Sequence, residues 1–370
     1  MDTAKPRMDD NSTPVPTPAP HRRRPRYAGK NPRRFEEKYK EHDPQRYADT
    51  VAKILASGKT PAGTHRPIMV AEIMAVLAPQ PGEVAVDGTL GYGGHAQEIL
   101  ARLQPGGRLV GLDADPLELP KTEARLRALG FGPDTFTAHR SNFAGLPQVL
   151  AQAGLPGADI ILADLGVSSM QIDDPARGFS VKHDGPLDMR MNPQRGQSAS
   201  ALLQKIMPAA LSEMLANFSD EPNATVLAPL LAGKIFTTTR ELGETIRTAL
   251  PRLGKDDSDL TVRRVFQTLR IAVNDEFSAL ETFLRNLPAC LKPNGRAAIL
   301  TFHSGEDRRV KKAFAVGKQA GVYLEIAEEV IRPAPEERNS NPRSAPAKLR
   351  WARRAGEQTK EGKTGASCRA

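Results

Sequence analysis

The fold is decided by the stretch Val84-Ala85-Val86-Asp87-Gly88-Thr89-Leu90-Gly91-Tyr92-Gly93-Gly94-His95, in which an apolar run ends in an aspartate and leads into a glycine-rich turn. A helical pattern follows, and a second apolar run over residues 108–113 ends in Asp113, 19 residues after Gly94. Glycines give the turn access to positive φ and let backbone N–H groups approach a ligand, while an acidic side chain at the end of the next strand can hold ribose hydroxyls. The stretch predicts one βαβ unit that binds an adenosine-containing cofactor.

The order of glycines in the turn discriminates between cofactors. A dinucleotide needs Gly-x-Gly-x-x-Gly at a helix N-terminus to seat its pyrophosphate, whereas this turn reads Gly91-Tyr92-Gly93-Gly94. Asp87 would repel a pyrophosphate, but its carboxylate can accept hydrogen bonds from the ammonium group of S-adenosylmethionine. The residues favour a methyl donor over NAD. The competing interpretation is that the glycines only let strand and helix pack.

Composition places the chain among globular intracellular proteins. Its 370 residues, 39% hydrophobic and 26% charged, suffice for a large core and more than one folded unit. No run of about 18 apolar residues and no apolar N-terminal segment occurs, so we expect neither a membrane span nor a signal peptide, and a cytoplasmic location. Cys290 and Cys368 have no disulfide or zinc-site spacing, and we expect no metal.

The net charge of +9 is concentrated at the two ends of the chain. Residues 1–60 carry 14 Lys and Arg against 8 Asp and Glu, and residues 332–370 carry 10 against 4. The centre, residues 61–331, has 28 basic and 31 acidic residues. Basic ends suit a polyanionic partner such as RNA, or they only keep a folded body soluble.

Strand and helix patterns alternate along the first part of the body. Helical stretches separate the strand patterns at residues 84–87, 108–113, 135–139 and 160–164. This alternation predicts an α/β fold with a parallel, doubly wound sheet. The fifth strand, 296–302, comes more than 130 residues after the fourth, behind a turn at 291–296. Because a crossover needs only about a dozen residues, the excess predicts a helical domain inserted at the ligand-binding edge of the sheet.

The predicted organisation has four parts. They are a basic, mostly disordered extension (1–62) with short helices near 34–40 and 45–56, a Rossmann-like methyltransferase domain (63–172 and 275–331), an inserted helical substrate-recognition domain (173–274), and a basic C-terminal tail (332–370).

Three segments carry residues suited to chemistry. Asp164 ends the fourth strand, where its carboxylate can orient an amine or accept its proton, or can only cap the next helix. Gln171, in the polar loop that follows, can hydrogen-bond a cofactor or a base edge. Phe302 and His303 end the fifth strand and can stack on a base. Two arginines on the amphipathic stretch 263–274, Arg264 and Arg270, can reach phosphate.

Several of these segments resemble the RsmH (MraW) family of bacterial 16S rRNA methyltransferases over residues 64–354. The longest matching runs are Asp164-Leu165-Gly166-Val167-Ser168-Ser169, continued to Ser180, and Gly185-Pro186-Leu187-Asp188-Met189-Arg190-Met191. Shorter matches are His65-Arg66-Pro67, 87–95, 113–116, Asn142-Phe143, 266–274 and 302–311. The resemblance implies a Rossmann-like fold with a helical insert. It also implies S-adenosylmethionine-dependent methylation of N4 of a decoding-site (P-site) cytidine in 16S rRNA of the small (30S) ribosomal subunit.

The resemblance also implies roles for individual residues. The cofactor contacts fall on Gly93, Gly94, His95, Asp113, Phe143, Asp164 and Gln171, with Phe143 against the adenine. The cytosine amine is a weak nucleophile that must lose a proton, and our hypothesis gives that proton to Asp164 or Asp188. RNA contacts are expected from Arg190, Arg264, Arg270, Phe302 and His303. Methylation at an amine needs neither metal nor a covalent cysteine.

Three segments depart from the family pattern. Gly305 stands where the family usually has Leu, residues 218–221 replace a Gly-Glu-Glu, and residues 341–346 alter an arginine-rich tail. These departures are expected to lie away from the cofactor and to affect the RNA-facing surface. Two other functions stay open: methylation of another RNA or DNA base, and a non-catalytic ribosome-assembly factor that retains a cofactor pocket. The oligomeric state, monomer or homodimer, is also open.

Overall fold

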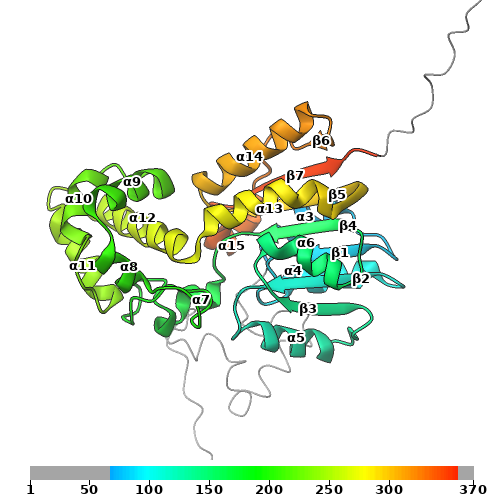
Figure 1. Ribbon diagram of the computed structural model, residues 1–370, viewed down its shortest axis with the longest axis horizontal. Coiled ribbons are helices and arrows are strands. Elements are labelled where there is room, and N and C mark those ends of the chain that lie inside the picture. Colours follow the sequence, from blue (N-terminus) through cyan, green and yellow to red (C-terminus); the bar gives the residue numbers. More distant parts are fainter. Residues whose placement is uncertain (1–66, 357–370) are drawn as a thin grey trace, which may run out of the picture.

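The computed structural model describes residues 67–356, and the predicted N-terminal extension with its two short helices lies outside these residues. The chain forms a seven-stranded sheet of order β3-β2-β1-β4-β5-β7-β6 (Figure 1). Strands β1 to β5 are parallel, and β7 is antiparallel to both β5 and β6. The strands are β1 Val84–Asp87, β2 Arg108–Asp113, β3 Phe136–Arg140, β4 Ala158–Asp164, β5 Leu291–Thr301, β6 Tyr323–Ile326 and β7 Lys348–Arg354.

The predicted α/β fold and its first five strands are confirmed. The strands expected at 84–87 and 108–113 begin and end at those residues, because their apolar runs are bounded by a turn and an aspartate. The predicted turn at 291–296 instead forms an irregularity within β5, where pairing with β4 jumps from Leu291 to Arg296. Asn294 there has φ 63°, in the left-handed region.

The C-terminal segment differs from the prediction of a basic tail. Residues 348–354 form β7, a strand that lies between β5 and β6 inside the sheet. Leu349 and Ala352 are fully buried, and the carboxylate of Asp307 accepts hydrogen bonds from Arg350 (2.6 Å) and Lys348 (3.0 Å). Asp307 thus pairs with two of the four basic residues of β7, whose charges made the segment resemble a tail rather than a strand. The part of the predicted tail from residue 357 onward lies outside the described residues.

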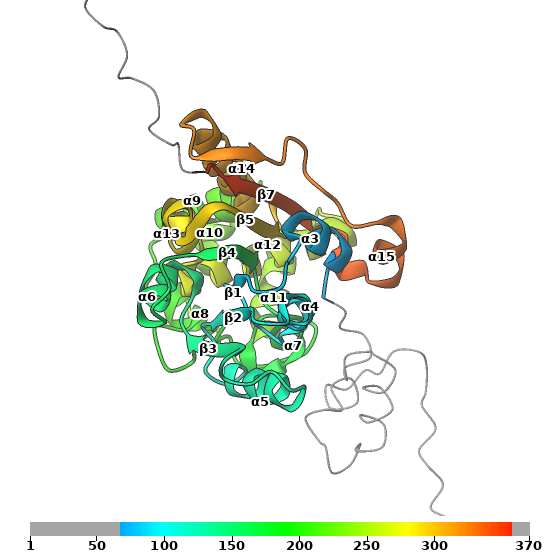
Figure 2. The ribbon, with the colours of Figure 1, turned by 90° about the vertical axis from the view of Figure 1, so that its right-hand side faces the viewer.

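Helices cover both faces of the sheet (Figure 2). One face packs against α3 Val70–Leu77, α4 Gly94–Leu103 and α5 Leu119–Ala128, and the other against α6 Leu146–Gln152, α13 Glu276–Cys290 and α14 Ser304–Gln319. Each large aliphatic side chain buried in these two cores contributes about 1.5–3 kcal/mol of transfer free energy. The short helix α15 Pro335–Ser340 lies beside α3, since Glu337 accepts a hydrogen bond from the backbone N–H of Met69 (2.9 Å). No helix among residues 67–356 is long and apolar enough to cross a membrane.

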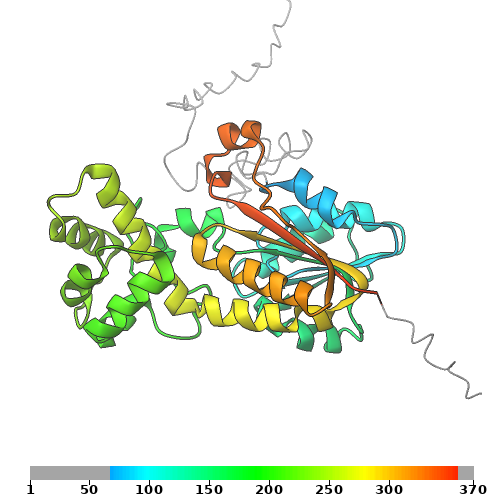
Figure 3. The same cartoon turned by 90° about the horizontal axis from the view of Figure 1, so that it is seen from above.

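The segment between β4 and β5 is helical and has a hydrophobic core of its own. The residues of this third core all come from positions 167–273. The helices are α7 Ser169–Asp173, α8 Ala199–Lys205, α9 Pro208–Ser219, α10 Ala224–Leu231, α11 Thr239–Ala249 and α12 Lys255–Asn274. They extend to one side of the sheet (Figures 1 and 3). The chain turns from α12 into α13 at Asp275, whose φ is 51°. We therefore propose that residues 173–274 are an inserted domain.

Candidate active site

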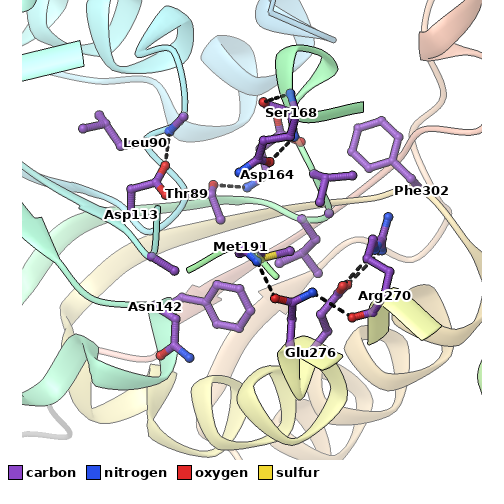
Figure 4. Close-up of a pocket in the computed structure, with 18 of the residues that line it drawn as sticks. Thr89, Leu90, Asp113, Asn142, Asp164, Ser168, Met191, Arg270, Glu276 and Phe302 are labelled. Atoms are coloured by element: carbon purple, nitrogen blue, oxygen red, sulfur yellow. Dashed lines mark hydrogen bonds and ion pairs between the residues drawn. The ribbon is translucent and has the colours of Figure 1, made fainter. Parts of the chain in front are cut away.

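The candidate site is a cavity of about 1060 Å³ beside the carboxyl ends of the parallel strands (Figure 4). It lies where the strand order reverses between β1 and β4, the position at which doubly wound sheets bind ligands. Its walls come from the glycine turn, the ends of β2 to β5, and the loop and helix α12 of the inserted segment. The cavity therefore has a sheet side suited to a cofactor and an insert side suited to a second substrate.

The glycine turn requires its glycines for two different reasons. Gly93 has φ 79°, which is strained for a residue with a Cβ atom, and it caps the N-terminus of α4. A Cβ atom on Gly94 would lie 2.4 Å from Cγ of Pro67, so this glycine lets the N-terminal segment pack against the helix. Gly93, Gly94 and His95, which the family resemblance assigns to cofactor contacts, all line the cavity.

Asp113 is held in place by the backbone around it. Its Oδ2 accepts a hydrogen bond from the N–H of Gly91 (2.7 Å) and its Oδ1 one from the N–H of Asp115 (2.8 Å). Burial raises the pKa of Asp113 to about 6 despite these bonds, so the carboxylate is ionised at neutral pH. It can accept hydrogen bonds from a pair of ribose hydroxyls. Phe143 follows β3, lines the cavity, and packs edge-on against Phe283 with ring centres 5.4 Å apart.

Asp164 lies at the centre of the site, at the end of β4. Its backbone N–H donates to the hydroxyl of Thr89 (2.6 Å), which ties β4 to the glycine turn. Its Oδ1 is buried and accepts no hydrogen bond from the residues that the structure describes. Burial, followed by the charge of Glu306, raises the pKa of Asp164 to about 7. A carboxylate with such a pKa can accept a proton at neutral pH.

His95 approaches the other oxygen of Asp164, with 3.6 Å between Nδ1 and Oδ2. Its Nε2 is 2.9 Å from the carbonyl oxygen of Ile68, which can only accept, so Nε2 carries the proton. Burial lowers the pKa of His95, which favours the neutral ring. In the neutral ring with its proton on Nε2, Nδ1 has a lone pair that faces Asp164.

Asp87 does not have the predicted position. Its side chain is 2% exposed and is not among the residues that line the cavity. Its Oδ1 accepts a hydrogen bond from the N–H of Thr89 (3.1 Å), so the carboxylate stabilises the start of the glycine turn. The expectation that it meets the ammonium group of a methyl donor is not supported by this geometry. Sequence reasoning missed the burial because a strand-end aspartate can face either the ligand or the turn.

Asp188 also lies outside the cavity lining, unlike Asp164. Its two oxygens accept hydrogen bonds from Nε (2.9 Å) and Nη2 (2.6 Å) of Arg190. Burial by itself would raise the pKa of Asp188, but the hydrogen bonds and charge of Arg190 outweigh it and hold the pKa below its usual value. A carboxylate so held is a poor proton acceptor, and the charge of Arg190 is partly balanced by Asp188.

Of the other residues predicted to bind RNA, two line the cavity and two lie outside its lining. Phe302 lines the cavity, and so does Arg270, but the guanidinium of Arg270 donates two 2.8 Å hydrogen bonds to Glu276. Arg264 lies outside the lining, with Nη1 3.9 Å from Glu221. His303 is also outside it, with Nε2 3.1 Å from Oε1 of Glu306.

A buried network that sequence reasoning missed joins the cofactor side to the insert. Nη1 of Arg177 donates to Oδ2 of Asp115 (2.8 Å), and Nη2 donates to the carbonyl oxygens of Arg190 (3.1 Å) and Met191 (2.9 Å). Gln171 lines the cavity, but its amide also donates to Asp115 (2.8 Å). Since Asp115 and Arg177 are 62 residues apart, no local pattern predicts their contact.

Comparisons with known proteins identify close relatives. A family model described as the MraW methylase family matches residues 62–355. Ribosomal RNA small subunit methyltransferase H 1 of Lachnoclostridium phytofermentans is 47% identical over 355 residues, covering 94% of this chain and 95% of that protein. Ribosomal RNA small subunit methyltransferase H 2 of Alkaliphilus metalliredigens is 48% identical over 342 residues, covering 90% and 97%.

Solved structures give more distant matches. A SAM-dependent O-methyltransferase of Thermotoga maritima has a TM-score of 0.35 at 10% identity, covering 79% of this chain and 66% of that one. A SAM-dependent methyltransferase of Aquifex aeolicus has a TM-score of 0.35 at 9% identity, covering 87% and 97%.

Proposed function

Because the chain belongs to the MraW methylase family, we propose that it methylates the N4 amine of a decoding-site cytidine in 16S rRNA, with S-adenosylmethionine as the methyl donor. Relatives at 47% and 48% identity over 90% or more of the chain bear the name of a small-subunit rRNA methyltransferase. The observation that carries the proposal is the carboxylate of Asp164, which lines the same cavity as the glycine turn and Phe302 and has one oxygen without a hydrogen-bond partner among residues 67–356. The proposed partner is the small ribosomal subunit.

The residues of the sheet side fit the proposed methyl donor. Asp113 would bind the ribose hydroxyls through a carboxylate that two backbone N–H groups hold in place. Phe143 would lie against the adenine, and the turn at Gly93 and Gly94 would admit the donor's polar end. When bound, S-adenosylmethionine supplies a methyl group activated by a sulfonium charge. Asp164 also suits a cationic neighbour, since a positive charge would favour its ionised form.

Residues at the ends of β4 and β5, together with Arg270 of α12 and Glu276 of α13, fit the acceptor. The exocyclic amine of cytosine is conjugated with the ring and has little nucleophilicity, so catalysis depends on orientation and on removal of a proton. The carboxylate of Asp164, whose side chain is 27% exposed and lines the cavity, would accept a hydrogen bond from the amine and then its proton. Phe302 would stack on the base, and the ion pair between Arg270 and Glu276 would form the wall behind it.

Two matched variants test this proposal. Purified protein is incubated with methyl-labelled S-adenosylmethionine and unmethylated small subunits, and the RNA is digested and analysed for N4-methylcytidine. Asp164→Asn should lower kcat by about 10²- to 10⁴-fold, as expected for loss of a positioned base. Asp188→Asn should retain most of the rate, because Asp188 is paired with Arg190 outside the cavity. Equal losses in both variants would refute the role of Asp164, and no methylation by the wild type would refute the proposed activity.

A further inference from the structure

Five arginines line the cavity, and they differ in whether a carboxylate neutralises them. Arg270 is paired with Glu276, and Arg343 donates to both oxygens of Asp173 at 2.8 and 2.9 Å. The other three have no ion pair with any residue in the range 67–356; they are Arg140, Arg195 and Arg263. An arginine left without a carboxylate at a cavity is available to an anionic ligand.

These three arginines come from three separate elements around the cavity. Arg140 is the last residue of β3, Arg195 lies in the loop that leads to α8, and Arg263 lies on α12 about two helical turns before Arg270. Two of them therefore come from the inserted segment and one from the sheet. A ligand that touches all three must span both sides of the cavity.

The charged residues that line the cavity differ in exposure: most of the exposed ones are basic, and most of the acidic ones are buried or half-buried. Of the charged lining residues, those with exposed side chains are the three arginines and Asp275. The other lining carboxylates are half-buried or buried, as in Asp113, Asp164 and Glu306. A mainly positive rim thus surrounds an interior that contains the acidic groups. Such a cavity suits a substrate with a neutral base that enters and phosphates that stay outside.

We propose that Arg140, Arg195 and Arg263 bind the phosphates that flank the acceptor nucleotide, and that this nucleotide is extruded from its strand into the cavity. The inference rests on the proposed function. A base inside the cavity can reach Asp164 only if it leaves its stack, and its sugar–phosphate backbone then remains at the rim. The guanidinium groups fit phosphate through paired N–H donors. The substrate class is accordingly an unpaired RNA segment held at phosphates on both sides of the reacting base.

The test measures how strongly salt weakens binding of unmethylated small subunits. Arg140→Gln, Arg195→Gln, Arg263→Gln and the triple variant are compared with the wild type. The control is Arg252→Gln, which removes an exposed arginine of the insert that does not line the cavity. Loss of three phosphate contacts to a single strand should flatten the slope of log K against log salt by about 2. A fourfold rise in salt should then cost the triple variant about 15- to 20-fold less affinity than the wild type.

Two further measurements separate this inference from other causes. The KM for subunits should rise in the triple variant while the Kd for S-adenosylmethionine and the melting temperature stay unchanged. An unchanged salt slope, or an equal flattening by Arg252→Gln, would overturn the inference even if the wild type methylates its substrate. If the wild type binds subunits but transfers no methyl group, the proposed function fails, and the salt slopes still decide whether these arginines bind phosphate.

Discussion

Replacement of Arg177 by methionine should lower the free energy of unfolding by about 3–5 kcal/mol, the cost of breaking a buried ion pair. The side chains of Arg177 and Asp115 are 9% and 1% exposed. Methionine keeps much of the apolar stem, but it leaves a buried carboxylate without its cation and removes the donor to two carbonyl oxygens. The cost should therefore arise from the lost charge and donors rather than from a cavity.

Urea unfolding measures this cost, followed by far-UV circular dichroism and by the fluorescence of Trp351, the single tryptophan of the chain. The matched control is Arg102→Met, since Arg102 pairs with Glu98 on an exposed helix surface, where the side chains are 43% and 42% exposed. The control should cost at most about 0.5 kcal/mol. The double variant Arg177→Met and Asp115→Leu should be less destabilised than the sum of the single variants by about 1–3 kcal/mol. A loss in Arg177→Met no larger than that of the control would refute the reasoning.

Three further predictions follow from the site and its surroundings. The value of kcat/KM should rise about tenfold between pH 6 and pH 8, because Asp164 must be ionised to accept a proton and its pKa is about 7; a flat profile would contradict this. Glu306→Gln removes a negative charge that raises the pKa of Asp164, so the rising limb of the same profile should move to lower pH, and a shift to higher pH would contradict the assignment. Gly305→Ala in the first turn of α14 should lower the melting temperature, because the new Cβ would lie 2.7 Å from Cζ of Phe277 and overpacking costs about 1–3 kcal/mol. Without this contact, replacing a helix glycine by alanine would stabilise the protein by about 0.5–1 kcal/mol. A raised melting temperature would therefore contradict the packing.

The parts of the fold that sequence predicts are those encoded in contiguous residues. The βαβ unit with Asp113 and the strand that ends in Asp164 follow from short apolar runs bounded by polar turns. Strand β7 does not, because its four basic residues resemble a solvated tail in sequence, and only the structure shows that Asp307 of α14 pairs with two of them. The contact of Asp115 with Arg177 likewise depends on how the insert folds back against the sheet.

In the candidate site, the sequence likewise identifies which residues are charged but not which residues they pair with. Sequence identified Arg270 as a cation near the substrate, and the structure places it at the cavity, but Glu276 neutralises it across the break between α12 and α13. The unpaired arginines of the rim, such as Arg140 and Arg195, were not singled out, because an arginine in a loop or at a strand end has no distinguishing pattern. Only the three-dimensional arrangement separates paired cations from available ones.

Two of the three departures from the family pattern meet in space. The ring of Phe218 lies 5.2 Å from that of Phe277, which also packs against Gly305, while Asp220 accepts hydrogen bonds from Ser304 (2.6 Å) and Arg308 (3.0 Å). These residues join α9 of the insert to α14, and the side chains of Asp220 and Arg308 remain exposed. The third departure was expected away from the cofactor, but residues 342, 343 and 346 line the cavity.

The most direct test of the central claim is the modification state of the small-subunit rRNA in the host. The gene is deleted, the rRNA is digested, and N4-methylated cytidine at the decoding site is measured by mass spectrometry, with and without a plasmid copy. The account predicts loss of the modification on deletion, rescue by the wild-type copy, and no rescue by Asp164→Asn. Unchanged N4 methylation after deletion would contradict it.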